Sequence, residues 1–212
     1  MKISEARGLP GNLGSRLRTL ALRLGFAVWA AAMLLIGSVL MAGHWLALPL
    51  PAAVDPILKR ALAQLDDGAQ GQWQLVHVMY SECRCSQRTL DYLSSRATPD
   101  GVKERILLVG KDATRASQAR SHGFLVEEIT AEELKLRFNI ESAPLLIAID
   151  PSGALRYVGG YTQHQQGLDY QDLEILADLR ANRPNPTLPA YGCAVSKELQ
   201  SYLDPIGIKY RR

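Results

Sequence analysis

The chain has 212 residues, which is enough for one domain with a sizeable core or for a small pair of domains. Hydrophobic residues make up 47% of it and charged residues 21%, the composition of an ordinary globular protein. Much of the small net charge of +3 lies in the first 23 residues, so the remainder is nearly neutral and gives no support to nucleic-acid binding.

An uncharged segment follows this basic start. No Asp, Glu, Lys or Arg occurs from Leu24 to Val54, and the apolar centre runs from Gly25 to Gly43. As a helix this centre is about 28 Å long, close to the thickness of the hydrocarbon core of a bilayer. His44 and Trp45 come next, where amphipathic side chains meet lipid headgroups.

The position of the basic residues predicts how such a helix is oriented. They lie before the apolar segment, so the positive-inside rule places the N-terminus in the cytoplasm and the chain from about residue 50 outside. The sequence therefore predicts a cytoplasmic basic segment over residues 1–24 and a transmembrane anchor over 25–48. The alternative is a cleavable signal peptide, whose apolar region is usually shorter than this one, about 7–15 residues. Both interpretations export the rest of the chain to a compartment where disulfides persist.

Capping residues mark several helices in the exported part. Asp55 followed by Pro56 begins one helix, Asp112 begins another that ends at Gly123, and Thr130 with Glu133 forms a capping box. In chain order the first predicted elements are a helix over 56–65 closed by Gly68 and Gly71, a strand over 72–80, a helix from the cysteines at 83 and 85 to Arg96, and a strand over 105–109. A helix over 112–123, a short ambiguous segment over 124–126 and a helix over 130–138 come next. The last elements are a strand over 145–149, its antiparallel partner over 154–158, a helix over 169–182 and a short helix over 196–203.

The strand over 72–80 is apolar on both of its faces, which predicts a central strand covered on both sides. His77 lies within it and is predicted to be a hydrogen-bonded core histidine. Residues 183–212 are predicted to form a proline-rich linker and a C-terminal tail.

Three cysteines, Cys83, Cys85 and Cys193, carry the chemistry. An odd number leaves several arrangements open: one disulfide pair with a free thiol, a relay of three thiols, or a metal site.

The order of these elements resembles the thioredoxin-like superfamily over about residues 55–182. Cys83 matches the nucleophilic cysteine of that family, at the helix that follows a central strand, and Pro144, preceded by Ala143, matches its cis-proline. The resemblance implies an α/β fold: a central mixed sheet flanked by helices, here preceded by one transmembrane helix and followed by a C-terminal tail. It also implies that Pro144 faces the cysteines and that Ala143 and Tyr161 contact substrate.

The motif departs from the family in its spacing. The family has Cys-x-x-Cys, whereas this chain has Cys-Arg-Cys-Ser, with Ser86 at the place of the second cysteine. With its anchor the chain looks like the membrane-tethered thiol-disulfide and cytochrome-assembly members, which implies a single-pass protein of the bacterial inner membrane with its main domain in the periplasm.

The position of Cys83 favours a thiolate, because a helix N-terminus stabilises negative charge; Arg84 and Arg88 add to this effect and Glu82 opposes it. Residues two apart on a helix point to nearly opposite sides. A Cys83–Cys85 bond therefore needs Cys83 in the loop before the helix, and strain would make that bond easily reduced.

We therefore predict thiol-disulfide exchange, by an oxidoreductase or isomerase without a cofactor, on protein thiols or a redox partner protein. Cys83 would attack, Cys85 would resolve, Pro144 would shape the substrate groove and Cys193 would be an auxiliary thiol if the tail folds back. One alternative is a copper chaperone that uses Cys83, Cys85 and either His164 or Cys193. The other is a redox-inactive interaction module.

Overall fold

The computed structural model describes residues 12–45, 47–65, 71–165, 167–205, 207 and 209–210. The chain divides into two compact units, Met1–Trp45 and Leu46–Arg212. Three predictions lie outside the described residues: the first 11 residues of the basic segment, the interfacial side chains of His44 and Trp45, and the helix end at Gly68.

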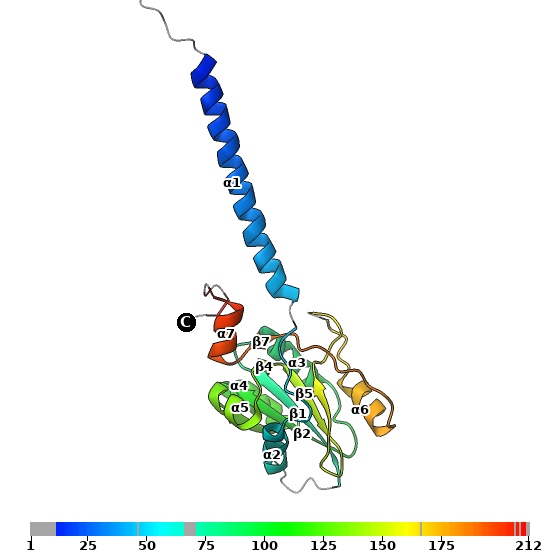
Figure 1. The fold of residues 1–212 in the computed structure, drawn as a ribbon. Coiled ribbons are helices and arrows are strands. Elements are labelled where there is room, and N and C mark those ends of the chain that lie inside the picture. The colour runs from blue at the N-terminus through cyan, green and yellow to red at the C-terminus, as the bar shows by residue number, and fades with distance from the viewer. Residues whose placement is uncertain are drawn as a thin grey trace, which may run out of the picture. The chain divides into compact units, whose positions relative to one another are not determined.

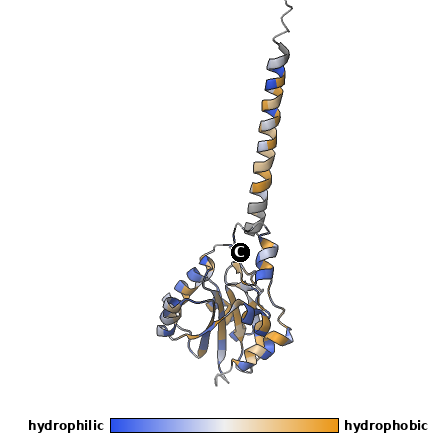
Figure 2. Ribbon diagram, turned by 90° about the vertical axis from the view of Figure 1, so that its left-hand side faces the viewer, coloured by the Kyte–Doolittle hydropathy of each residue, from blue (hydrophilic) through white to orange (hydrophobic). Residues whose placement is uncertain are grey.

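The first unit contains one long helix, α1 (Asn12–Trp45). Its segment Gly14–Ser38 is long and apolar enough to cross a membrane by length and composition, and a signal sequence would meet the same test. The predicted N-terminal apolar helix is therefore confirmed, and Figure 2 shows its apolar residues in orange. The helix begins earlier than residue 25, so that Arg16, Arg18 and Arg23 lie within it, because arginine and its leucine neighbours are good helix formers.

The second unit is built on a mixed five-stranded sheet with the strand order β3-β2-β1-β5-β6 (Figure 1). The central strand β1 pairs in parallel with β2, which pairs in parallel with β3, whereas β5 is antiparallel to both β1 and β6. The bounds are β1 (Trp73–Tyr80), β2 (Val102–Val109), β3 (Leu125–Ile129), β5 (Leu145–Ile149) and β6 (Leu155–Gly159). This is the predicted thioredoxin-like fold, with β1 buried on both faces as expected.

Helices cover both faces of the sheet. Alternate residues of β1 point to opposite sides, so Val76 and Val78 lie in one core cluster and Leu75 and Met79 in the other. The first cluster includes residues of α2 (Pro56–Gln64) and α5 (Ala131–Phe138), and the second includes residues of α3 (Arg84–Ser95), α4 (Ala113–Ser121) and α6 (Asp172–Arg180).

The predicted caps are present. Asp55 accepts a hydrogen bond from the Ile57 amide at 2.8 Å, and Asp112 accepts one from the Arg115 amide at 3.0 Å. Thr130 and Glu133 form the reciprocal capping box of α5.

Some element bounds differ from the predicted ones. Strand β2 begins at Val102, three residues before the predicted start, because it pairs along the whole length of β1. The ambiguous segment after α4 is the edge strand β3. Its two glutamates at 127 and 128 interrupt the alternation of apolar and polar residues that would predict a strand. Helix α6 begins at Asp172, three residues after the predicted start, because the preceding Gln171 amide is bonded to the Tyr161 carbonyl, 2.9 Å away.

The chain after α6 is not a free linker. Leu188, Ala190, Ala194 and Val195 are buried, and the Gly160 amide donates to the Leu188 carbonyl at 2.9 Å. The segment then forms β7 (Cys193–Ala194), which pairs in antiparallel fashion with β4 (Ser142–Ala143), and it ends in α7 (Lys197–Leu203). Neither two-residue strand was predicted, since so short a strand has no alternating pattern. The capping of α7 by Ser196 agrees with the predicted start of that helix.

Candidate redox site

Cys83 is the residue that immediately precedes α3, and it is fully buried. Strand β1 leads directly into it, and a tight turn returns the Cys83 amide to the Tyr80 carbonyl at 3.0 Å. Its backbone is extended, with φ of −100° and ψ of 117°, so that Cys83 stands outside the helix while Cys85 is the second helical residue. This is the geometry that a Cys-x-Cys pair needs for its two thiols to meet.

Pro144 lies opposite Cys83. The Ala143–Pro144 peptide bond is cis, as the resemblance implied, and the Cys83 sulfur lies 3.8 Å from the Ala143 carbonyl oxygen. Ala143 is itself fully buried.

The C-terminal tail brings the third cysteine to the same place. In the β4–β7 pair Ala143 faces Cys193, and the Val195 amide donates to the Glu141 carbonyl at 2.7 Å. All three cysteines are free thiols in this structure. Cys193 and Cys85 both hydrogen-bond to the Cys83 sulfur, so the structure brings all three predicted cysteines together.

These contacts shift the pKa values of the three thiols in opposite directions. Hydrogen bonds from Cys193, then from Cys85, and then from Ser86 hold the pKa of Cys83 well below its ordinary value, against the opposing effect of burial. The same contacts with Cys83, together with burial, raise the pKa of Cys85 and of Cys193. The Ser86 hydroxyl also accepts a hydrogen bond from the Tyr80 amide at 3.0 Å.

Two cavities open on this site, and they share no lining residue. One, of about 30 Å³, is lined by Cys85 and Pro144 together with Arg88, Tyr161, Tyr170 and Tyr191 among others. The other, of about 290 Å³, is lined by Cys193 together with Tyr80, Glu82, Lys197, Gln200, Lys209 and Tyr210. Cys85 and Cys193, both half-buried, therefore connect the buried Cys83 to two different cavities.

A buried polar network begins at Tyr161, which lines the smaller cavity. Its hydroxyl lies 2.7 Å from His77 Nδ1, and His77 Nε2 lies 3.1 Å from Glu104 Oε1. Arg96 then bridges Glu104 to Asp172, donating to Asp172 Oδ2 at 2.9 Å. His77 is thus the core histidine that was predicted. The rest of the network was missed, because its members are far apart in the sequence and only the fold brings them together.

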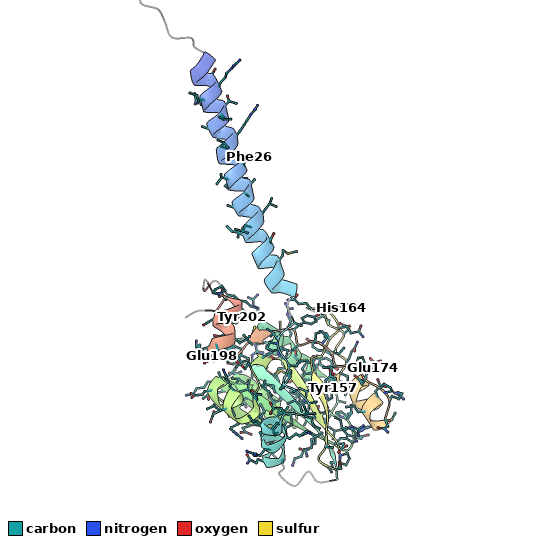
Figure 3. The ribbon with its side chains drawn as sticks, in the orientation of Figure 1. Phe26, Tyr157, His164, Glu174, Glu198 and Tyr202 are labelled. Atoms are coloured by element: carbon teal, nitrogen blue, oxygen red, sulfur yellow. The ribbon has the colours of Figure 1, made fainter. Side chains whose placement is uncertain are left out.

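Of the other described histidines, His122 and His164 are not part of the site. His164 is exposed in the loop after β6, and Figure 3 shows it on the opposite side of the unit from Glu198 and Tyr202 of α7. Within the described residues, no group of three or more His, Cys, Asp or Glu side chains is placed to hold a metal ion. The predicted copper site with His164 is therefore not assembled there.

Comparison with known proteins gives likenesses in structure alone. No family model matches the chain, and no curated protein matches it. An uncharacterized conserved protein from Geobacillus kaustophilus superposes with a TM-score of 0.50, at 15% identity, over 62% of this chain and 80% of that protein. A hypothetical protein from Sinorhizobium meliloti also has a TM-score of 0.50, at 14% identity, over 60% and 80%. The thioredoxin domain of a thiol-disulfide oxidoreductase from Bacteroides vulgatus has a TM-score of 0.39, at 17% identity, over 53% and 83%.

At these identities a likeness concerns the fold. The strand order, the cysteine that precedes α3 and the cis-proline opposite it define a protein of the thioredoxin-like fold.

Proposed function

We propose that this chain carries out thiol-disulfide exchange on protein thiols, with Cys83 as the attacking thiolate. The observation that carries the proposal is the placement of Cys83 directly before α3 and beside the cis Ala143–Pro144 bond, with its sulfur 3.8 Å from the Ala143 carbonyl oxygen. The thiolate is the reactive form in disulfide exchange, and the lowered pKa of Cys83 favours that form.

The exchange needs no group beyond the thiols themselves. The Cys83 thiolate attacks one sulfur of a substrate disulfide, a mixed disulfide forms, and the other substrate sulfur leaves as a thiolate. A second thiol of the site then attacks the Cys83 sulfur, which releases the substrate and leaves a disulfide within the chain. Cys85 was predicted to be this resolving thiol, and its position beside Cys83 supports that role.

Substrate would dock on the surface around the smaller cavity. Cys85, Pro144 and Tyr161 line it together, which supports the predicted role of Pro144 in shaping the substrate groove and that of Tyr161 in contacting substrate. Ala143 is covered by β7 in this structure, so its role in substrate binding would require β7 to separate from β4.

The long apolar helix supports a location at a membrane. We propose that α1 is a single-pass anchor in a bacterial inner membrane and that the thioredoxin-like unit lies in the periplasm, where disulfides persist. The copper-chaperone alternative has less support, because His164 is exposed in the loop after β6 and no group of three or more described His, Cys, Asp or Glu side chains is placed to hold a metal ion.

The test is to trap the mixed disulfide with the full chain in detergent. A Cys85→Ser/Cys193→Ser double variant retains Cys83 alone, and we expect it to hold a disulfide-containing peptide covalently at Cys83. The matched single-thiol variants that retain only Cys85 or only Cys193 should trap at least tenfold less. Equal trapping by all three variants, or no turnover by the unaltered chain, would refute the proposal.

A further inference from the structure

Cys83 has no direct access to solvent, so exchange with the surroundings must pass through its neighbours or require movement. Cys83 and Ala143 are fully buried, and the edge of β4 is occupied by β7. The tail is also fixed at several points. The Leu48 amide donates to the Ala190 carbonyl at 2.8 Å, and Ser196 is bonded to Glu141. These contacts hold Cys193 at the site.

The cavity at Cys193 has the size and the charge of a small-molecule site. Its volume of about 290 Å³ is near the lower end of the range for small-molecule pockets, about 300–1,000 Å³. Two of its lining residues are cationic, Lys197 and Lys209, against one carboxylate, Glu82, which accepts a hydrogen bond from Tyr80 at 3.0 Å. Two lysines against one carboxylate give this lining a net positive charge.

The wall that carries Lys209 is held in place by a buried carboxylate. Asp204 accepts hydrogen bonds from the amides of Lys209 and Tyr210, at 2.7 and 2.8 Å. The Tyr210 hydroxyl in turn accepts a hydrogen bond from the Ala194 amide at 2.9 Å. The Lys209 ammonium lies 5.2 Å from the centroid of the Tyr210 ring. These bonds place a cation and an aromatic ring beside Cys193.

From this cavity we infer a second entrance to the redox site: it binds a small anionic disulfide, or the corresponding thiol, which exchanges with Cys193 and through Cys193 with Cys83. The inference rests on the proposed thiol-disulfide exchange and adds the class of molecule that supplies or removes its electrons. The cavity contains both a thiol and the cations that attract carboxylates.

The steps balance without another reagent. The Cys193 sulfur attacks the bound disulfide RSSR and gives its proton to the departing sulfur, so that a Cys193–SR bond forms and RSH leaves. The Cys83 thiolate then attacks the Cys193 sulfur, so that a Cys83–Cys193 disulfide forms and RS⁻ leaves. Two electrons pass from the two cysteines to the small disulfide, and the same steps in reverse let the small thiol reduce the site.

The test uses three small disulfides that differ in charge: dithiodiglycolate, a dianion; bis(2-hydroxyethyl) disulfide, which is neutral; and cystamine, a dication. The full chain in detergent, as a Cys83→Ser/Cys85→Ser variant, stops the reaction at the Cys193 adduct, which is measured by mass spectrometry. At low salt we expect the dianion to react about five to ten times faster than the dication, and the difference to shrink as salt screens the lysines.

Matched variants identify the source of this preference. Lys197→Gln and Lys209→Gln should each reduce it by about half or more, whereas Lys59→Gln, on the exposed surface of α2, should leave it unchanged. With Cys83 restored, the adduct should give way to a Cys83–Cys193 disulfide.

Three results would overturn the inference: the same rate for all three disulfides, a preference that survives both lysine substitutions, or an adduct that never passes to Cys83. If peptide trapping at Cys83 persists in these cases, only the second entrance fails. If trapping is also absent, the proposed function itself fails.

Discussion

Cys193 lies directly opposite Ala143, although 50 positions separate them in the chain, because β7 pairs with the two-residue strand that precedes cis-Pro144. In this pairing the tail supplies a hydrogen-bond donor to the Cys83 sulfur. The tail is therefore part of the environment that lowers the pKa of Cys83, and substitutions in the tail should change that pKa.

Replacing Cys193 by alanine removes the strongest of the hydrogen bonds that lower the pKa of Cys83. We expect that pKa to rise by about 1 to 2 units, the equivalent of one hydrogen bond to a charged group. Cys193→Ser retains a hydroxyl donor and should raise it less. The measurement is a pH titration of the thiolate absorbance of the full chain, and coincident titrations for the three proteins would contradict the role of Cys193.

Gly192 allows the close approach of the tail to β4. A Cβ atom at this position would lie 2.0 Å from the Ala143 carbonyl oxygen and 2.6 Å from Pro144 Cδ. Since backbone atoms cannot move aside easily, we expect Gly192→Ala to separate β7 from β4, to lower the free energy of unfolding by about 1–3 kcal/mol and to accelerate alkylation of Cys193.

The matched control for this substitution is Gly71→Ala. At Gly71 φ is +84°, but a Cβ atom would meet no other atom within 4 Å. The substitution therefore strains the backbone of a distant loop without touching the tail, and Cys193 should be alkylated at the normal rate. Urea unfolding and the rate of labelling at Cys193 test both variants, and equal labelling of Cys193 in both would show that Gly192 does not hold the tail.

The sequence predicted the sheet and its helices because their patterns are local. Strand β1 is apolar over its whole length, and the caps at Asp55, Asp112 and Thr130 are read from neighbouring residues. The pairing of β4 with β7 was not predictable in this way. Each strand has two residues, and their pairing depends on where the tail folds after α6.

The same distinction applies to the site. Cys83, Cys85 and Pro144 were identified from a motif and a resemblance, whereas the placement of Cys193 could be offered only as one possibility for the tail. The network of His77, Glu104 and Arg96 was missed for a related reason. Charged residues in a sequence are normally predicted to be exposed, and only the three-dimensional arrangement shows that these charges are buried together.

Arg96 is the cation of this buried network, and its side chain is only 7% exposed. Replacing it by methionine leaves the carboxylates of Glu104 and Asp172 buried without the cation that neutralises them. We expect the free energy of unfolding to fall by about 3–5 kcal/mol, measured by urea denaturation. The matched control is Arg156→Met, which breaks the 3.2 Å ion pair with Asp150 at the surface and should cost less than about 1 kcal/mol. Similar losses for the two variants would argue against a buried network.

Glu104 should make the stability of the chain depend on pH below neutrality. Burial opposes its ionisation, but hydrogen bonds from His77 and Arg96 outweigh burial and lower its pKa from 4.5 to about 2. Because the folded state binds this proton less readily than the unfolded state, the stabilisation is fully present above pH 4.5 and is lost as the pH falls towards 2. The difference in pKa corresponds to about 3 kcal/mol.

A Glu104→Gln variant tests this directly, since it retains the shape of the side chain but cannot ionise. The wild-type chain should be more stable than the variant at pH 7, and the gap should narrow steadily below pH 4.5. The free energies of unfolding of both proteins, measured by urea denaturation at several pH values between 7 and 3, give this gap. A gap that stays constant over this range would mean that Glu104 ionises in the folded chain as it does in the unfolded one.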